Sequence, residues 1–573
     1  MLSLKQNLCF KHICYIVRTL PDKEKIILLV LIIMLGIGVL GFLWKINALF
    51  LVEVPADGGT LREGIIGTPR FINPLLAISE ADRDLTALIY SGLMRSDGHG
   101  GLIPDLAEKY EISEDGLSYT FTIKSNAIWH DGKPVTSDDV IFTIQQVKNP
   151  NLKSPRRANW EGVEVEKIDE RTVRFWLKRQ YAPFIENTTL GILPKHLWKD
   201  VAVEEMGFNE LNIQPIGSGP YRIDKLSRNS SGIITSYELE RNKNFVLGKP
   251  HIKKLIFKFY SSEKELLSAY KNKEIDSMGS VSPQNIAELT KSKRGVVKTL
   301  TLPRTFGVFF NQNNAPIFSK YEVRKALNVA TDKERIIKEV LAGFGTVLNS
   351  PIPPGTFGAL DIESSVASTT QAQNILKAAG WEYNQEEKVF EKESSKKKET
   401  MRLEFSLATS DAPELVHTAE LLKTFWEELG AKVNVKIFEI GDLNQNIIRP
   451  RKYDALLFGE VVGSGDPDPF AFWHSSQRND PGLNIALYAN SKVDKLLEEA
   501  RAISDPEKRK EKYELFQKEI QADLPAVFLY SPHYLYIVPE SLKGFETYNI
   551  TMPHERFSQI HNWYIKTRKI YQW

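Results

Sequence analysis

The longest apolar stretch of the chain covers residues 26–44, IILLVLIIMLGIGVLGFLW, and contains no charged side chain. About 20 such residues are enough for a helix to cross the hydrocarbon core of a membrane. Lysine and arginine outnumber acidic residues before this stretch, which is typical of the cytoplasmic side of a membrane span. The pattern predicts a cytoplasmic segment over residues 1–25, a transmembrane helix over residues 26–44, and a body outside the cytoplasm.

A cleaved signal peptide is the alternative interpretation of the same stretch. It requires a shorter apolar region that is followed by small residues at a cleavage site. Here the run ends in Gly41-Phe42-Leu43-Trp44-Lys45, which has no small residues at the required spacing and no cysteine to carry a lipid. We therefore expect the helix to be kept as an anchor.

After the apolar stretch, the hydrophobic pattern predicts strands and helices in alternation. Turn-forming residues predict a tether over residues 45–60. Alternation with a period of two, typical of half-buried strands, appears in residues 61–66, 117–123, 252–260 and 304–311, and in a hairpin over 161–177. Helical spacing appears in residues 82–90, 263–271, 320–341 and 413–429, and in a helix capped by Thr136 to Asp139. Strands and helices in this order favour α/β lobes.

Length and composition narrow the classes of protein. At 573 residues the chain is too long for one ordinary core, so we expect two or three domains beyond the anchor. The 74 lysines and arginines nearly balance the 72 acids, and a net charge of +2 gives no general attraction to nucleic acid. Both cysteines, Cys9 and Cys14, precede the apolar stretch. The body is therefore expected to have no nucleic-acid partner, no disulfide and no thiol nucleophile.

The sequence offers no catalytic motif. It has no GxSxG elbow, no HExxH pair and no phosphate-binding loop that ends in Gly-Lys-Ser/Thr. The histidines are dispersed, and His130 and His196 each lie near a tryptophan, as packed or surface residues do. A hydrolase stays open as an alternative because catalytic triads assemble from distant positions. We expect a protein that is not an enzyme.

The most suggestive chemistry lies in residues 454–473, DALLFGEVVGSGDPDPFAFW. A buried strand is predicted over 456–462, followed by a glycine-rich loop in which a proline follows each of Asp466 and Asp468. Rigid carboxylates beside aromatic rings suit a ligand's ammonium group, because carboxylates form charge-assisted hydrogen bonds and ring faces attract cations. The alternative is a structural turn, in which the aspartates accept backbone N–H groups and proline presets φ.

Other motifs are spread along the body. They are residues 101–108 (GLIPDLAE), 129–140 (WHDGKPVTSDDV), 216–221 (IGSGPY), 323–333 (VRKALNVATDK), 350–355 (SPIPPG) and 372–381 (AQNILKAAGW). In this order they resemble the family five extracellular solute-binding proteins, which are the oligopeptide, dipeptide and nickel-type receptors of ABC importers. The resemblance covers nearly everything from about residue 60 to the C-terminus.

The resemblance implies an α/β fold of the larger periplasmic-binding-protein class, a two-lobed clamp with an extra subdomain, here preceded by one transmembrane helix. Lobe I would comprise residues 61–94, 217–302 and 531–573. The inserted subdomain would span residues 95–216, and lobe II residues 303–530. The hinge would lie near residues 301–304 and 528–531.

The resemblance also implies the function. A receptor of this family would capture a small solute, most simply a peptide, between its lobes and deliver it to the permease and ATPase subunits of an ABC importer. We expect a monomer without cofactor or metal, attached to the cell membrane through one helix, with its body extracellular or periplasmic.

In the resembling family, the loop that contains Asp466 and Asp468 lines the cleft. Peptide receptors of the family place an aspartate a few residues before the Asp-Pro pair to hold the ligand's amino terminus. An ungapped match puts Gly463 there, and Glu460 would substitute only on a shifted register. The expected ligand-binding residues are Asn73, Arg304, Glu460, Val462, Gly463, Asp466, Asp468 and Trp473.

Other functions stay open beside the peptide receptor. A receptor for a nickel chelate or an oligosaccharide would share the fold and differ in the chemistry of the cleft. A membrane-anchored sensor would signal through residues 1–25, which are too few for an enzymatic domain. A membrane-anchored hydrolase would have to turn over peptides.

Overall fold

The computed structural model describes Tyr15 and residues 19–49, 51–291, 294–363, 366–393, 400–463 and 465–571. The chain forms two compact units, Met1–Asp57 with Ile565–Trp573, and Gly58–Tyr564. Cys9 and Cys14 lie outside the described residues.

The first unit consists of a long helix and a two-stranded ribbon. Helix α2 (Asp22–Leu49) is followed by β1 (Leu51–Ala56), which pairs antiparallel with β23 (Lys566–Tyr571). The stretch expected to be a tether thus contains the end of α2 and a strand. Strand β1 forms because β23 supplies a backbone partner, since a single exposed strand is not stable alone.

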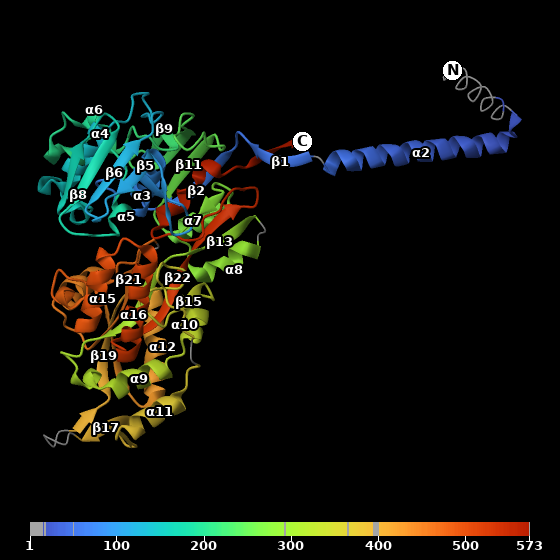
Figure 1. Ribbon diagram of the computed structural model, residues 1–573. Coiled ribbons are helices and arrows are strands. Elements are labelled where there is room, and N and C mark those ends of the chain that lie inside the picture. Colours follow the sequence, from blue (N-terminus) through green and yellow to red (C-terminus); the bar gives the residue numbers. More distant parts are fainter. Residues whose placement is uncertain are drawn as a thin grey trace. The chain divides into compact units, whose positions relative to one another are not determined.

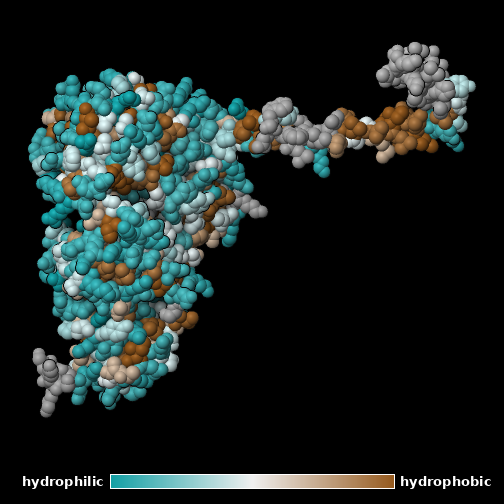
Figure 2. Space-filling view, viewed as in Figure 1, coloured by the Kyte–Doolittle hydropathy of each residue, from teal (hydrophilic) through white to brown (hydrophobic). Residues whose placement is uncertain are grey.

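Helix α2 is long and apolar enough to cross a membrane. An 18-residue window within its stretch Asp22–Phe42 has a mean hydropathy of 2.8, and none of that window is buried. Figure 2 shows this helix as an apolar surface, whereas the visible face of the second unit is largely hydrophilic. A signal sequence shares these features, because length and composition alone define them.

The second unit is organised around a 12-stranded mixed sheet with the path β20-β19-β21-β14-β22-β12-β2-β11-β10-β9. Strand β22 (Ala526–Pro539) is shared by two halves of this sheet (Figure 1). Its first residues pair with β14 and β15, and its last residues pair with β12 and β13. We call the halves the β14 part and the β2 part.

The β2 part contains parallel and antiparallel strands. Strand β2 pairs in parallel with both β11 and β12, and β9 to β11 are antiparallel. Helices α7 and α8 cover one face, where Leu266, Met278 and Leu535 form a buried cluster. The elements are β2 (Thr60–Ile66), α3 (Glu80–Ile89), β9 (Tyr221–Arg228), β10 (Ile234–Arg241), β11 (Lys254–Tyr260), α7 (Glu263–Lys271), β12 (Ser277–Met278), α8 (Pro283–Lys291), β13 (Gly295–Thr301), η8 (Pro553–Phe557) and η9 (Ile560–Asn562).

Between α3 and β9 the chain forms a separate four-stranded antiparallel sheet, β5-β6-β8-β7, and the small pair β3-β4. Phe121, Phe175 and Phe184 pack edge to face or tilted beneath it. The elements are β3 (Met94–Ser96), β4 (Leu102–Pro104), β5 (Ala107–Ile112), β6 (Ser118–Ile123), α4 (Ser137–Lys148), η1 (Pro150–Leu152), η2 (Arg157–Trp160), β7 (Val163–Lys167), β8 (Thr172–Leu177), α5 (Phe184–Asn187), α6 (Lys195–Trp198), η3 (Val203–Phe208) and η4 (Glu210–Asn212).

The β14 part has helices on both faces of its strands. Consecutive residues of β14 point to opposite faces, so that Val308 joins the core under α9 to α12 and Phe309 joins the core under α15 and α16. The elements are β14 (Arg304–Phe310), η5 (Pro316–Ser319), α9 (Tyr321–Ala330), α10 (Lys333–Val340), β15 (Gly345–Val347), α11 (Thr369–Ala378), β16 (Glu382–Asn384), β17 (Val389–Glu393), β18 (Thr400–Arg402), β19 (Glu404–Ser410), α12 (Pro413–Leu429), β20 (Lys432–Phe438), α13 (Ile440–Asp442), η6 (Leu443–Ile448), β21 (Ala455–Val461), α14 (Phe470–Trp473), η7 (Ser475–Gln477), α15 (Ser491–Ala502) and α16 (Pro506–Asp523).

Local signals in the sequence correctly placed several elements. The capping box of Thr136 and Asp139 opens α4, and the predicted hairpin is β7 and β8. Helix α7 occupies the predicted residues 263–271. Helix α12 ends at Gly430, whose φ of 109° is a left-handed conformation that favours glycine.

A buried group of charges joins the β2 part to the C-terminal segment. The Arg556 guanidinium donates to Asp84 at 2.9 and 2.5 Å and to Glu63 at 3.2 Å. Tyr536 and Ser277 also donate hydrogen bonds to Glu63. All three charged side chains are at most 2 % exposed. Because the acids come from β2 and α3, Arg556 holds η8 against both elements.

We expect Arg556→Met to destabilise the protein by about 3–5 kcal/mol, because Asp84 and Glu63 would be left buried without a cation. Burial raises the pKa of Asp84 to about 7, and Arg556 opposes this shift. The loss of stability caused by the substitution should therefore be smaller at pH 5, where Asp84 and Glu63 can bind protons. Chemical denaturation of the full chain in detergent measures both effects.

The matched control is Arg222→Met, which breaks a surface pair with Glu240 at 2.9 Å. It should change the free energy of unfolding by less than about 1 kcal/mol. Equal losses in the two variants would contradict a structural role for the Arg556 cluster.

Candidate functional site

A cavity of about 380 Å³, which we call the main cavity, is lined by segments that are distant in sequence. They are α3, the segments around η2 and α5, the loop after β21, and the C-terminal segment around η8. The cavity therefore lies where the β2 part and its insert meet the β14 part. Its charged lining residues include Arg83, Arg156, Glu186, Asp466, His554 and Glu555.

Four carboxylates line this cavity, those of Asp105, Glu186, Asp466 and Glu555, and Asp105 is paired with Arg95 at 2.8 Å. Burial raises the pKa of Glu186 to about 8, and the nearby carboxylates of Glu555 and Asp466 add to the shift. Burial also raises the pKa of Glu555 to about 7, although the backbone N–H groups of Thr551 and Met552 donate to it at 2.9 and 3.2 Å. Like charges disfavour one another's ionisation, so a cationic group of a ligand that binds here would favour the ionised form of these carboxyl groups.

The same cavity contains arginines. Burial lowers the pKa of Arg156, and Arg83 adds to the effect as a like charge. Burial and these arginines hold the pKa of His554 at about 3, so that its imidazole is neutral at physiological pH. Two guanidinium groups in one place suit a carboxylate, which they can bind with paired hydrogen bonds. The main cavity thus offers complementary charges for both ends of a zwitterion.

The loop after β21 supplies one wall. Asp468 is held by Arg501 at 2.7 and 2.6 Å and by the Tyr181 hydroxyl at 3.2 Å. Asp466 accepts a hydrogen bond from Tyr513 at 2.7 Å and lies 3.0 Å from Arg509. Both aspartates therefore have cationic partners within the protein. Asp466 lines the main cavity, whereas Asp468 lies outside its lining and links Arg501 of α15 to Tyr181 of the insert.

Two glycines of this loop allow close approach. A Cβ atom at Gly463 would lie 2.5 Å from the carbonyl oxygen of Asp466, and one at Gly465 would overlap the Glu186 carboxylate. Both glycines line the main cavity. The loop can reach Glu186 only because no side chain stands between them.

The structure brings Gly463 and Asp466 together at the main cavity and places the other candidate residues elsewhere. Asn73 is buried, bonded to Asn212 and to the backbone of Leu75. Trp473 lies in the core beside Phe309 and Phe528. None of these is in the lining of the main cavity.

The remaining candidates lie at or beside the ends of β14 and β21. Arg304 pairs with Val461 in the strand register, and its backbone N–H donates to the Ser531 hydroxyl at 3.4 Å. The Val462 N–H donates to the Pro303 carbonyl at 2.9 Å. Glu460 lines a second cavity of about 480 Å³, which we call the side cavity.

Sequence reasoning missed Arg83, Arg156, Glu186 and Glu555 as candidates. Each is a charged residue in or beside a short or amphipathic segment. Charged residues in such segments are usually exposed to solvent. Glu555 carries a local signal, since it caps η8, but that signal concerns only the helix. Their convergence depends on the tertiary fold and has no local pattern.

Comparison with known proteins identifies relatives of this architecture. A family model described as bacterial extracellular solute-binding proteins, family 5 Middle, matches residues 101–482. The oligopeptide-binding protein AppA of Bacillus subtilis is 28 % identical over 520 residues, which are 89 % of this chain and 92 % of that protein. The dipeptide-binding protein of Escherichia coli K12 is 26 % identical over 506 residues, covering 84 % and 90 % of the two chains.

Solved structures are similar in fold. The structure of Bacillus subtilis AppA in complex with a nonapeptide has a TM-score of 0.68, and the match covers 90 % of this chain and 100 % of that one. NikZ of Campylobacter jejuni, in complex with Ni(L-His), is 28 % identical and also has a TM-score of 0.68, covering 89 % and 100 %. The fold is therefore the mixed α/β periplasmic-binding-protein fold of these receptors, as the sequence motifs predicted.

We expect Glu186→Gln to stabilise the ligand-free protein at high pH. The pKa of Glu186 is raised to about 8 in the folded state, so folding favours the protonated side chain. The free energy of unfolding of the wild-type protein therefore falls as pH rises toward and through 8. At pH 9 the variant should be more stable by about 2 kcal/mol, after allowance for solvent that reaches the half-buried side chain. At pH 4 the difference should vanish. Thermal unfolding of the full chain across pH measures this.

The exposed Glu164 of β7 provides a matched control in the same insert. Glu164→Gln should leave the pH profile of the wild-type protein unchanged. A Glu186→Gln profile parallel to that of the wild-type would show that the carboxylate is solvated.

Proposed function

Because the chain belongs to the bacterial extracellular solute-binding proteins of family 5, we propose that the solute it receives for its ABC importer is a short peptide. The main cavity carries this proposal, since carboxylates and guanidinium groups line the same space. A peptide has an ammonium group at one end and a carboxylate at the other, and it matches both sets of charges. A volume of about 380 Å³ lies within the range of small-ligand pockets.

The residues of the main cavity receive distinct roles in this proposal. Glu186 and Asp466 hold the ammonium group of the peptide, and Glu186 has the stronger claim because Asp466 already pairs with Arg509. Arg83 and Arg156 bind the carboxylate. Gly463 and Gly465 let the loop backbone approach the ligand.

A strand edge near the cavity is suited to bind the main chain of the peptide. Strand β19 pairs with β21 only at Ala455 and Leu456, so that Gly459–Val461 have no strand partner on that edge among the described residues. An extended peptide can add to such an edge through backbone hydrogen bonds, which give affinity that depends little on the ligand's sequence.

For the lobes, we propose the division that the sequence motifs imply. Lobe I comprises residues 61–94, 217–302 and 531–573, the inserted subdomain residues 95–216, and lobe II residues 303–530. The chain passes between the proposed lobes at two places, and both support this division. They are the link between β13 and β14 and the middle of β22. The hinge is proposed at residues 301–304 and 528–531.

Binding is proposed to act by population shift. A ligand that contacts both lobes stabilises the closed state, because only that state offers both sets of contacts. The permease would recognise the closed form. When closure releases water from the cavity, the local dielectric constant falls and the charge interactions inside the cavity become stronger.

A metal complex is the second candidate, because the similar NikZ structure contains Ni(L-His). Among the described residues, no group of three or more His, Cys, Asp and Glu side chains is arranged to hold a metal ion. A metal would therefore have to arrive within an organic chelate, whose carboxylates Arg83 and Arg156 could bind.

We expect short peptides to co-purify with the protein. Mass spectrometry of ligand released by denaturation should show peptides, and added peptide should lower the radius of gyration of a soluble form that starts at Lys45. Histidine–nickel complexes and haem serve as alternative ligands in the same titrations. Release of a metal chelate alone, or a radius of gyration that no peptide changes, would contradict the proposal.

We also propose that α2 stays in the membrane as an uncleaved anchor that confines the receptor near its permease. Such confinement raises the effective concentration of the receptor at the permease. Cell membranes washed at high salt should retain the whole chain of 65.2 kDa. A variant in which a cleavable signal peptide replaces residues 1–44 should release the body from the membrane. At equal external protein levels, this variant should take up less peptide than the full chain. A mature N-terminus after residue 44 in the natural protein would refute the anchor.

A further inference from the structure

The side cavity lies within the β14 part and is separate in its lining from the main cavity. It is bounded by β21, by η6, by α14 and by the loop before α15. Its walls are mostly apolar, formed by Ile448, Phe458, Phe472, Leu483 and Ile485. One acidic residue of β21, Glu460, interrupts this apolar lining.

Glu460 is buried without any compensation. The side chain is 4 % exposed, and neither carboxylate oxygen has a hydrogen-bond partner. Burial alone raises the pKa of Glu460 well above its usual range, with no charged group opposing the shift. A buried carboxylate costs several kcal/mol unless it is paired, so such a residue is expected to have a function.

The other charged residues of the side cavity do not serve as partners for Glu460. The guanidinium of Arg451 donates to the carbonyl oxygens of Ile448, Arg478 and Gly482 at 2.8, 3.1 and 2.7 Å. Arg449 lies 3.8 Å from Asp480. The cavity thus contains one carboxylate whose positive partner is missing from the protein.

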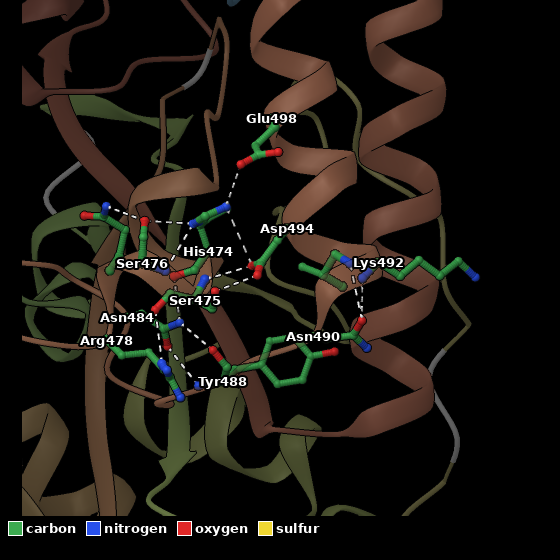
Figure 3. A network of polar contacts seen from close by, with 12 residues as sticks. His474, Ser475, Ser476, Arg478, Asn484, Tyr488, Asn490, Lys492, Asp494 and Glu498 are labelled. Carbon is green, nitrogen blue, oxygen red and sulfur yellow. Dashed lines mark hydrogen bonds and ion pairs between the residues drawn. The ribbon is translucent and has the colours of Figure 1, made fainter.

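The loop before α15, which supplies Leu483 and Ile485 to the side cavity, takes part in the network in Figure 3 through Asn484. The figure also shows His474 between Ser476 and the acids of α15. Asp494 of α15 accepts hydrogen bonds from Ser475 N–H at 2.8 Å and from its hydroxyl at 2.5 Å. Asn484 donates to the carbonyl oxygens of His474 and Tyr488 at 3.1 and 2.9 Å (Figure 3). The loop that carries Leu483 and Ile485 is therefore tied by Asn484 to the segments on either side of it.

We propose that Glu460 binds the cationic end of a lysine or arginine side chain of the captured peptide, with the stem of that side chain against the apolar walls. This inference rests on the proposed peptide function. Aromatic walls favour a cation as well, because ring faces attract positive charge. Glu460 precedes Gly463 of the main cavity by three residues, or about 10 Å along an extended chain. A peptide whose main chain lies at the main cavity could extend a basic side chain to Glu460.

Proton balance gives a distinctive signature. Burial favours the protonated form of the isolated carboxyl group in the ligand-free protein, and the arriving ammonium or guanidinium group keeps its own proton. Ion pairing favours the ionised carboxylate, so the carboxyl proton passes to solvent as the cation binds. Basic peptides should therefore release protons on binding, whereas neutral peptides should release none.

The test uses the full chain in detergent and alanine peptides of three to five residues. A single lysine is placed at each position in turn and compared with norleucine, which has the same four-carbon stem and no ammonium group. At one position we expect lysine to bind about ten- to hundredfold more tightly than norleucine. Calorimetry in two buffers of different ionisation enthalpy measures the released proton.

Glu460→Gln should abolish both the lysine preference and the proton release, while neutral peptides bind as before. Glu404→Gln is the matched control, because it removes an exposed acid of β19 in the same part of the fold. If norleucine peptides bind and lysine gives no preference at any position, or if Glu460→Gln keeps the preference, the role of Glu460 is wrong and peptide binding stands. If no peptide binds the wild-type protein, both the proposed function and this inference fail.

Discussion

The arrangement of the second unit depends on the backbone pairing of β22, which belongs to both halves of the sheet. Near its middle, the Ser531 hydroxyl donates to the Leu302 carbonyl at 3.1 Å and accepts the Arg304 N–H at 3.4 Å. One side chain therefore fastens together the two segments that connect the β2 part to the β14 part. Pro532 follows it and has no N–H to donate, so β22 lacks one ladder donor at that point. The proposed hinge at residues 528–531 lies here, between the end of β22 that pairs with β14 and the end that pairs with β13.

Buried charges fall into two groups that differ in their compensation. Arg556 with Asp84 and Glu63, and Arg501 with Asp468, are complete within the protein and hold elements together. Glu460 lacks a partner, and Glu186 faces other carboxylates. Because a buried carboxyl group without a cationic partner lowers stability, whether it is ionised or binds a proton, its presence at a cavity is better explained by a ligand than by the fold. The contrast separates residues that build the receptor from residues that would recognise its cargo.

The loop at residues 463–468 shows how far the sequence could predict the site. The Asp-Pro repeats and the following aromatic residues correctly drew attention to a loop at a strand end, and Asp466 lines the main cavity. Residue types alone could not show that Arg501, Arg509 and Tyr513 reach these aspartates from α15 and α16. Those partners lie more than thirty residues away, and they give each aspartate a cationic neighbour within the protein. Glu186 carried no local signal because its burial arises only when the insert meets Gly465.

By itself the sequence determined the apolar helix, the alternation of strands and helices, several caps and the family, because each depends on periodicity or on ordered local motifs. The tertiary structure alone decided which charges are paired, that β1 finds its partner in β23, and that two cavities with different chemistry lie on either side of the β21 end. Local patterns fix backbone conformation through short-range sterics and hydrogen bonds. The partners and burial of a side chain depend on segments that are brought together only by folding.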